Sequence, residues 1–472
     1  MTAPIIRQDI WTLSQQDEWH PVIRAYALAV GVLVDRSKQN RGDPTGWRYQ
    51  ASVHGGLSDP DTRFQNQCQH RTYYFPAWHR MYLHFFESIV RSVIANLDEV
   101  DDRTKQTWGL PYWNYSRGET FQVLPPAFRA VQLWDGKTDN PLFHLRNRNL
   151  NNGGKLPDTD VRLTSTLAPG AFVGTGTGGF AGPAIGLDYW GETPGAAFGS
   201  LETTPHNDVH VHVGGDMNSQ MSPLDPIFWL HHANVDRLWE VWLAQGGRSN
   251  PADRGFLDQD FWFHDADGVP QRKKVAELLT LADLGYSYED TSPPAGPLGA
   301  EAVAPEPEHP SQMIGATDRT LQLAGDSATV RIPLEAPSGP LAADDTPAKV
   351  YLRLDDLTAP RAPGVTYAVY IAAPAGDEST WGDHFVGTLA PFGIVEEGKR
   401  DVDHHAMRFI FDITELYNHL VAAGKWTNPV DVRFVPIGVE APPGPLAADD
   451  MVPGLDADPG VLNVGQVSVH VQ

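Results

Sequence analysis

The stretch His206-Asn-Asp-Val-His210 places two histidines four residues apart. On a helix, side chains at this spacing lie one turn apart on the same face, so both imidazoles can reach one metal ion. A third histidine, His232, follows 22 residues after the second in Ser222-Pro-Leu-Asp-Pro-Ile-Phe-Trp-Leu-His-His232-Ala-Asn-Val-Asp-Arg237. Asp225-Pro226 fits a helix start, and apolar residues recur at helical spacing behind His232. The sequence therefore predicts helices that bring three histidines to one metal ion.

A second set of three histidines lies upstream, namely His54, His70 and His79. Pro76, three residues before His79, fits a helix start, and apolar residues run down one side of the helix that we expect to follow. Imidazoles without a carboxylate suit copper, zinc or iron better than magnesium or calcium, which prefer oxygen ligands. Two such sites in one domain suggest a dinuclear centre.

Both blocks resemble the copper-binding signatures of the type-3 copper proteins, in particular the tyrosinases and polyphenol oxidases. The spacings of 16 and 9 residues in the first block, and of 4 and 22 in the second, are similar to those of the bacterial members. The connecting residues agree as well: Phe75-Pro76, His79-Arg80, Pro205-His206-Asn207, Asp225-Pro226-Ile227-Phe228 and His231-His232-Ala-Asn234-Val-Asp236-Arg237. The resemblance implies two groups of copper ligands: His54, His70 and His79 for the first ion, and His206, His210 and His232 for the second.

The resemblance also implies roles for three residues beside the ligands. Glu202 and Asn207 would hold a water that helps to deprotonate an incoming phenol, which ionises near pH 10 in water. The alternative for Glu202 is that it caps the helix of His206. Cys68 would form a thioether with His70, as in fungal relatives, whereas a buried free cysteine is the alternative.

Other residues are expected to support the ligands. Phe228, one turn before His232, should pack over the imidazoles, and Phe75 belongs to the same surroundings. We expect Asp236 to accept a hydrogen bond from a ligand, because metal-bound imidazoles usually donate their other N–H to a carboxylate or carbonyl. His231 adjoins His232 but points about 100° away around the helix, so we expect a structural role for it.

The whole chain is expected to be an α+β multidomain protein. Residues 1–290 would form a mainly α-helical catalytic domain, in which the resemblance implies a four-helix bundle around two copper ions. Its first helix is expected to begin at Ser14, with Asp17 as a capping partner. Residues 291–314 are rich in proline and form a linker. Short alternating apolar runs in residues 315–472 predict a C-terminal β-sandwich or barrel.

The C-terminal part resembles that of the plant enzymes, more loosely than the copper blocks do. In relatives this domain lies over the copper site and inserts one side chain, which keeps the enzyme latent until the domain is displaced. We expect the same lid here, with Trp381 as the inserted side chain; an ordinary exposed loop aromatic is the alternative. The segment Trp108-Gly-Leu-Pro-Tyr-Trp-Asn-Tyr115 also resembles one found in the family, and we expect it to pack in the core.

Charge and composition limit the partners. The net charge of −24 over 472 residues argues against nucleic acid or an anionic membrane as a partner, and no apolar run approaches membrane-spanning length. The N-terminus lacks the basic-then-apolar pattern of a secretion signal, which favours a cytoplasmic protein and leaves export by another route open. A single cysteine excludes internal disulfides. The sequence does not indicate an oligomeric state.

The resemblance implies an oxidase that uses O₂ and two copper ions on small phenols. It would hydroxylate monophenols at the ortho position and oxidise o-diphenols to o-quinones. A catechol oxidase or o-aminophenol oxidase would lack or redirect the hydroxylation, and a haemocyanin-like carrier would only bind O₂. Ser219, a small residue at the family's gate position thirteen before His232, argues against a blocked carrier. A zinc hydrolase is disfavoured because such sites usually include a carboxylate ligand.

Overall fold

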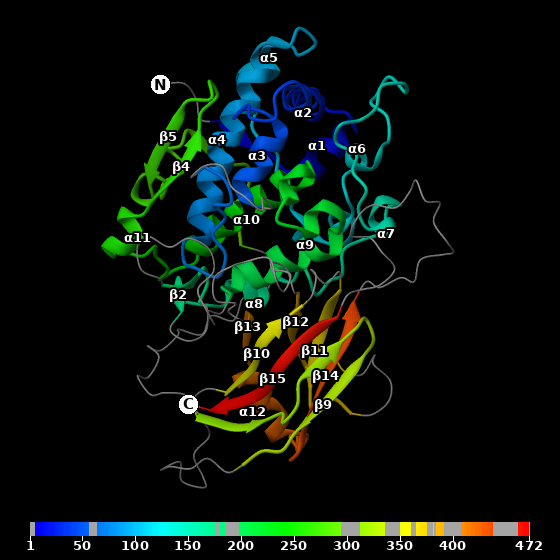
Figure 1. The fold of residues 1–472 in the computed structure, drawn as a ribbon, viewed down its shortest axis with the longest axis vertical. Helices are drawn as coiled ribbons and strands as arrows, with labels where there is room; N and C mark the ends of the chain where they lie inside the picture. Colours follow the sequence, from blue (N-terminus) through cyan, green and yellow to red (C-terminus); the bar gives the residue numbers. More distant parts are fainter. Residues whose placement is uncertain are drawn as a thin grey trace.

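The computed structural model shows two parts, a helical one and a strand-rich one that lies below it in Figure 1. Each part has its own hydrophobic core. Phe198 precedes the second histidine block in the sequence, yet its ring belongs to the core of the strand-rich part. The structure describes residues 5–55, 64–174, 179–184, 198–293, 312–335, 350–359, 365–374, 381, 384–390, 407–437 and 461–471.

Four helices of the first part carry histidines of the two blocks, which agrees with the expected helical bundle. They are α3 (Trp47–His54), α4 (Phe75–Ala95), α9 (Asp208–Val213), which continues the turn η3 (Glu202–Asn207), and α10 (Ile227–Leu243). Pro76 lies in the first turn of α4, where its missing N–H costs no helical hydrogen bond. Helix α4 packs against α10 and against α2 (Pro21–Gln39), so the ligand-bearing helices rest on an apolar support.

The start of the chain differs from the prediction of one helix from Ser14. Two helices form instead, α1 (Ile10–Gln16) and α2, and Asp17 ends the first rather than capping the second. The break has a local cause, because Pro21 cannot continue a helix but fits the first turn of a new one. The ring nitrogen Nδ1 of His20 accepts the N–H of Val22 at 3.3 Å and so caps α2.

Short elements complete the helical part. The strand β1 (Ile5–Arg7) pairs in parallel with β6 (Tyr286–Tyr288), which joins the beginning of the described chain to the end of the helical part. The others are α5 (Asp102–Thr107), α6 (Pro126–Arg129), α7 (Arg148–Asn151), α8 (Leu163–Leu167), α11 (Arg254–Asp258), β2 (Val173–Gly174), β3 (Gly182–Pro183), β4 (Asp260–His264) and β5 (Pro270–Lys274), with the turns η1 (Tyr115–Arg117), η2 (Glu119–Gln122), η4 (Gly215–Asn218), η5 (Ser222–Leu224) and η6 (Val275–Glu277).

The strand-rich part is a β-sandwich of two antiparallel sheets. One has the order β13-β10-β15-β7, with β8 also on β15, and the other has the order β12-β11-β14-β9. Alternate residues of the strands fill the space between the sheets, as the period-2 pattern predicted. The strands are β7 (Gln312–Ala316), β8 (Leu321–Leu323), β9 (Ala328–Ile332), β10 (Val350–Thr358), β11 (Thr366–Ile371), β12 (Phe385–Leu389), β13 (Met407–Asp412), β14 (Val430–Ile437) and β15 (Leu462–Val471), and one helix, α12 (Thr414–Ala422), accompanies them.

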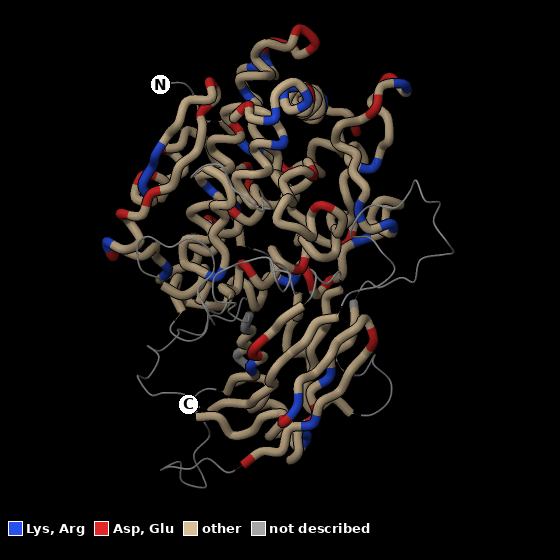
Figure 2. The backbone as a smooth tube through the Cα atoms, viewed as in Figure 1, with Lys and Arg blue, Asp and Glu red and all other residues tan. Residues whose placement is uncertain are grey.

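The charged residues lie mostly along the outside of both parts (Figure 2). Such a distribution is expected, because an unpaired charge inside the protein is costly. Among the described residues, no helix combines the length and the apolar character needed to cross a membrane. Several charged side chains inside the helical part are paired with one another, among them Arg7, Arg80 and Asp236.

Candidate metal centre

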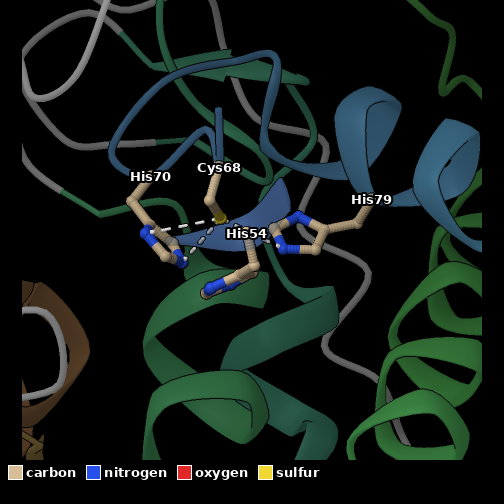
Figure 3. Close-up of side chains that lie close together, drawn as sticks. All are labelled: His54, Cys68, His70 and His79. Atoms are coloured by element: carbon tan, nitrogen blue, oxygen red, sulfur yellow. Dashed lines mark hydrogen bonds between the residues drawn. The ribbon is translucent and has the colours of Figure 1, made fainter. Parts of the chain in front are cut away.

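The first histidine cluster combines one loop and two helix ends (Figure 3). His54 is the last residue of α3, His79 lies in the first turns of α4, and His70 lies in the loop between these helices. The possible ligand atoms of these three histidines and of Cys68 all lie within 4.8 Å of one another. The structure thus brings together the three predicted ligands of the first ion.

The second cluster contains the three other predicted ligands and His231. His206 lies in η3, one residue before its end, and His210 lies in α9, so the two imidazoles come from consecutive turns, as their spacing predicted. The Nε2 atom of His210 lies 3.1 Å from Nε2 of His232. Two nitrogens at that separation can bind the same ion, since metal–nitrogen distances are about 2.0 Å.

The two clusters face each other. The rings of His79 and His232 are stacked, with centroids 4.3 Å apart and planes at 14°. The rings of His70 and His206 also meet across the same space, at 5.6 Å between centroids. Two metal ions held by these sets would be neighbours, which fits a dinuclear centre.

Hydrogen bonds fix the orientation and tautomer of four ligands. Their Nδ1 atoms lie close to oxygen atoms: His54 to the carbonyl of Gln220 at 2.7 Å, His79 to that of Phe75 at 2.8 Å, His210 to that of Met217 at 2.6 Å, and His206 to Oδ1 of Asn207 at 2.8 Å. An imidazole that donates from Nδ1 keeps its lone pair on Nε2, which can then bind a metal. The Nε2 atom of His54 is buried and has no hydrogen-bond partner among the described residues, as expected of an atom reserved for a metal. The donor set therefore fits two soft or borderline metal ions.

Burial keeps the ligands neutral. It is the main cause that lowers the pKa of all six imidazoles, and it lowers the pKa of His54 to about 4. Neighbouring imidazoles lower the pKa of His70, His79, His206, His210 and His232 further, because one charged ring would disfavour the next. Neutral rings bind metals without first losing a proton.

One short loop orients ligands of both clusters. Met217 and Gln220 supply the carbonyls that bind His210 and His54, respectively. Between them lies Ser219, whose hydroxyl donates to the carbonyl of Asp216 at 2.9 Å and accepts the N–H of Met221 at 3.1 Å. The predicted gate residue therefore stabilises the turn that presents these carbonyls. Sequence reasoning missed this loop, because any residue can supply a backbone carbonyl.

Two phenylalanines pack among the rings. Phe75 lies 4.7 Å from both His79 and His206, measured between ring centroids. Phe228 lies 4.1 Å from His232 and 5.3 Å from His54. Each phenylalanine therefore touches ligands of both clusters. Their apolar rings exclude water from the histidines, which strengthens the electrostatic interactions inside the centre.

The sulfur of Cys68 lies against two ligands of the first ion. It is 3.4 Å from Nε2 and 3.7 Å from Nδ1 of His70, and 3.4 Å from Nε2 of His79 (Figure 3). The carbon Cε1 of an imidazole lies between its two nitrogens. Similar distances to both nitrogens of His70 are consistent with a sulfur that lies beside this carbon.

Glu202 and Asn207 are both completely buried. Both carboxylate oxygens of Glu202 accept the backbone N–H of Arg71, at 3.1 and 2.9 Å. Arg71 follows His70 directly, so Glu202 connects the chain beside the second cluster to the loop of the first. Asn207 holds the ring of His206. The two residues thus lie next to ligands of different ions.

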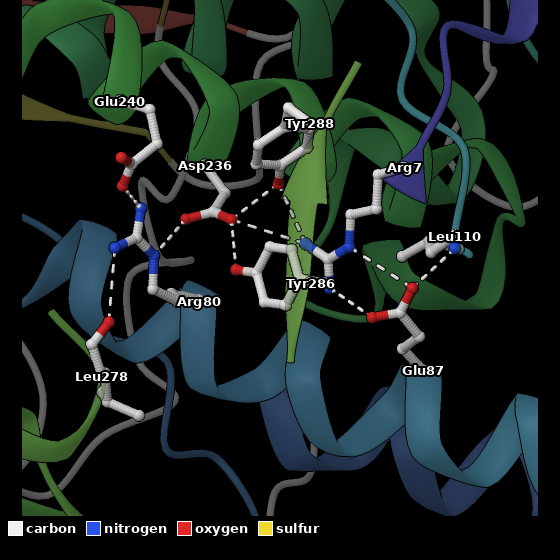
Figure 4. Close-up of polar contacts among 9 residues, drawn as sticks. All are labelled: Arg7, Arg80, Glu87, Leu110, Asp236, Glu240, Leu278, Tyr286 and Tyr288. Carbon is white, nitrogen blue, oxygen red and sulfur yellow. Dashed lines mark hydrogen bonds and ion pairs between the residues drawn. The ribbon is translucent and has the colours of Figure 1, made fainter. Parts of the chain in front are cut away.

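Asp236 does not have the predicted role. Its oxygens accept hydrogen bonds from Arg80 Nε at 2.5 Å, Tyr286 at 2.7 Å, Tyr288 at 2.6 Å and Arg7 at 3.4 Å (Figure 4). None of these partners is an imidazole, and Nδ1 of His232 has no hydrogen-bond partner among the described residues. The prediction was wrong because side chains one turn apart can point to different neighbours. Asp236 points to the arginines of β1 and α4.

Trp381 is placed in the sandwich, against the prediction that it reaches the ligands. Only 6% of its surface is exposed, and its ring contacts Tyr370 at 5.5 Å between centroids. The guanidinium of Arg433 lies 5.0 Å from the indole. These partners belong to β11 and β14, so the indole packs on its own sheet. The alternative prediction, that Trp381 is an ordinary exposed aromatic residue of a loop, is also wrong, because the side chain is buried.

The strands β11 and β12 both bring the sandwich against the metal-bearing helix α9, and β12 supplies the hydrogen bonds. The hydroxyl of Thr388 donates to Oδ2 of Asp208 at 2.6 Å, and Thr204 donates to the same oxygen at 2.6 Å. Ala390, just past the strand, packs against Val211. Asp208 lies between the ligands His206 and His210 in the sequence. The sequence did not predict β12, a strand of five residues with Gly387 at its centre, because glycine weakens the strand signal of so short a segment.

Comparison with known proteins gives one consistent result. The common central domain of tyrosinase matches residues 44–245, the polyphenol oxidase middle domain matches 250–295, and a domain of unknown function matches 310–441. The tyrosinase HcTyr1 of Hahella sp. (strain CCB-MM4) is 31% identical, with 98% of each chain covered. Chloroplastic polyphenol oxidase A of Solanum lycopersicum is 29% identical over 60% of this chain and 49% of its own. This chain thus spans about half the length of that plant relative.

Solved structures show the same fold. Latent apple tyrosinase has a TM-score of 0.61 at 20% identity, with 99% of this chain and 97% of the apple chain covered. Latent aurone synthase has a TM-score of 0.63 at 20% identity, with 99% and 89% covered. The family has a dinuclear copper centre, and the two facing histidine clusters fit it. With a tyrosinase related over its full length and both clusters in place, the chain belongs to the tyrosinase and polyphenol oxidase family and is a type-3 copper oxidoreductase.

Proposed function

We propose that the protein uses O₂ to hydroxylate small monophenols at the ortho position and to oxidise o-diphenols to o-quinones. Two bound copper ions supply the redox chemistry with O₂. The observation that carries the proposal is the stacking of His79 on His232, which makes one centre of two sets of neutral imidazoles. His54, His70 and His79 hold the first ion, and His206, His210 and His232 hold the second.

Glu202 and Asn207 assist the deprotonation of the phenol in this proposal. A phenol has a pKa of about 10 in water, so its oxygen binds a metal at neutral pH more readily when a nearby group takes the proton. Both residues are buried beside the clusters, and the amide of Arg71 fixes the carboxylate of Glu202. They hold a water that accepts the proton. Ser219 stands at the gate, where a small side chain leaves room for an aromatic ring.

Cys68 forms a thioether with His70 in this proposal. The bond joins Sγ to Cε1, and the S–H and C–H hydrogens leave as two protons and two electrons, which O₂ accepts at the copper centre. The position of the sulfur beside the ring of His70 supports this step. The intact mass of copper-loaded protein tests it. A mass lower by two hydrogens than that of copper-free protein is expected, and an unchanged mass would leave Cys68 a free thiol.

The C-terminal sandwich acts as a lid that keeps the enzyme latent. The chain divides into a catalytic domain of residues 1–290, a linker of residues 291–314 and a lid domain of residues 315–472. Support comes from the separate cores of the two parts and from β12, which contacts the helix of His210 through Thr388. Cleavage of the linker or displacement of the lid opens the centre to substrate.

The proposal is tested with copper-loaded protein, intact and after cleavage near residue 300. Oxygen uptake and quinone absorbance are measured with tyramine and with the matching catechol, dopamine. Turnover of tyramine that rises after cleavage supports both the hydroxylation and the latency. Turnover of dopamine alone would make the protein a catechol oxidase. No turnover in either form, with reversible O₂ binding, would make it a carrier.

A further inference from the structure

His231 lies in the second cluster although it is not one of the six predicted ligands. One of its ring nitrogens is within 4.8 Å of the ligand atoms of His206, His210 and His232, and the side chain is completely buried. The sequence suggested a structural residue that points away from the metal. A fourth imidazole this close to a three-histidine site is expected to have a more specific role than core packing.

The ring of His231 is packed directly on two ligands. It lies nearly parallel to the ring of His206, with centroids 5.6 Å apart and planes at 22°. It lies edge-on to His210, at 5.0 Å and 85°. These are the offset and T-shaped arrangements that aromatic rings favour. His231 therefore limits how far either ligand ring can rotate.

Tyr115 holds His231 in turn. Its hydroxyl lies 3.2 Å from Nδ1 of His231, and both side chains are completely buried. The aromatic segment that ends at Tyr115 is tied to the same helix, because the N–H of Trp113 donates to the carbonyl of Leu230 at 3.1 Å. The segment expected only to fill the core thus contacts a side chain beside the metal centre.

The hydrogen bond to Tyr115 engages Nδ1 of His231 and fixes the plane of its ring, while Nε2 is buried and has no hydrogen-bond partner among the described residues.

We propose that His231 is a positioning residue for the second copper ion, held by Tyr115 and holding the rings of His206 and His210. His231 acts on these ligands through ring packing, and removing residues that orient metal ligands changes metal affinity by about 10- to 100-fold. The inference rests on the proposed copper centre, and it concerns one of its two sites only.

Metal binding tests the inference without any measurement of turnover. Copper-free protein is titrated with Cu(I) under anaerobic conditions against a chromophoric chelator. The titration uses two backgrounds, His54→Asn to report the second site and His210→Asn to report the first. In each background we compare the native residue with Tyr115→Phe, which removes only the hydroxyl, and with His231→Phe, which keeps a ring but removes both nitrogens.

The expected result is a 10- to 100-fold weaker second site in both variants and an unchanged first site. Tyr112→Phe is the matched control, because Tyr112 lies in the same segment but packs on Tyr288, and it should leave both sites unchanged. Unchanged second-site affinity in Tyr115→Phe, or equal weakening of both sites, overturns the inference. If His231→Phe does not fold, Tyr115→Phe decides alone. Failure of the unsubstituted protein to bind two copper ions would instead contradict the proposed centre.

Discussion

Asp236 and Arg80 form a buried ion pair, with 2.5 Å between Oδ1 and Nε, that joins α10 to α4. These helices carry His232 and His79, whose rings are stacked. Burial acts to raise the pKa of Asp236, but Arg80, Arg7 and two tyrosine hydroxyls outweigh it, so the pKa is lowered. The carboxylate is therefore charged at neutral pH. It therefore links the two helices that carry His79 and His232.

Replacing Asp236 by asparagine should destabilise the protein strongly. The change leaves Arg80 and Arg7 with less negative charge around them inside the protein, and breaking a buried pair in this way typically costs about 3–5 kcal/mol. Urea unfolding of the copper-free protein measures the loss. Asp431→Asn is a suitable control, because its partner Arg331 is 70% exposed and the pair contributes little. Equal stability of the two variants would contradict the role given to Asp236.

Removing the hydroxyl of Ser219 should weaken both copper sites. Ser219→Ala loses two hydrogen bonds of the turn whose carbonyls orient His54 and His210. Each such bond contributes about 1 kcal/mol, so a several-fold faster transfer of both ions to a chelator is expected. Ser219→Thr keeps the hydroxyl and should retain copper as the unsubstituted protein does. Faster loss from one site only would show that the loop does not act on both clusters together.

Loss of the contact between the two parts should reduce latency. Thr388→Val removes a donor to the buried carboxylate of Asp208 and leaves an apolar group in its place. Thr204 still donates to the same oxygen, so the variant loses one hydrogen bond. Such a loss costs about 0.5–1.5 kcal/mol, which would favour the displaced lid by roughly 2- to 13-fold. The activity of intact protein, divided by that of protein cleaved near residue 300, should rise accordingly.

The control for this variant is Thr388→Ser, which keeps the donor. It should remain as latent as the unsubstituted protein. A Thr388→Val protein that is equally latent would show that β12 does not hold the lid in place. Cleaved forms of all three proteins should have the same activity, because the lid is then no longer attached through the linker.

The ligands were predictable from the sequence, whereas their surroundings were not. Two histidines four apart on a helix share a face whatever the rest of the chain does, so His206 and His210 were found by spacing alone. The carbonyl of Gln220 that orients His54 has no sequence signal. Asp236 lies one turn after His232, as expected of a hydrogen-bond partner, but its carboxylate binds Arg80 instead. A charged guanidinium stabilises a buried carboxylate more than a neutral imidazole does. Which residue of the sandwich meets the helices depends on how the two parts of the chain dock against each other, and local sequence patterns do not encode this.

The acid stability of the copper-free protein should depend on His84. Burial is the main cause that lowers its pKa to about 4, and Arg7 and Lys273 lower it further, although Glu87 acts in the opposite direction. The unfolded chain titrates near pH 6.5, so between pH 6.5 and 4 the unfolded state binds more protons than the native state. The contribution of His84 is therefore complete above pH 6.5 and is lost as the pH falls toward 4.

The substitution His84→Gln removes this titration. Protonation of the buried histidine ligands also destabilises the protein in acid, but it does so equally in both proteins. The comparison therefore isolates the contribution of His84 to stability. Urea unfolding at pH 7.5 and pH 4.5 should show a smaller loss for His84→Gln, by on the order of 1–2 kcal/mol once solvent screening is allowed for. Parallel losses in the two proteins would mean that His84 is solvated in the native state. The control is Asp101→Asn. Asp101 is exposed and its pKa is lowered, so it stays charged between pH 4.5 and 7.5, and the variant should lose as much stability over this range as the unsubstituted protein does.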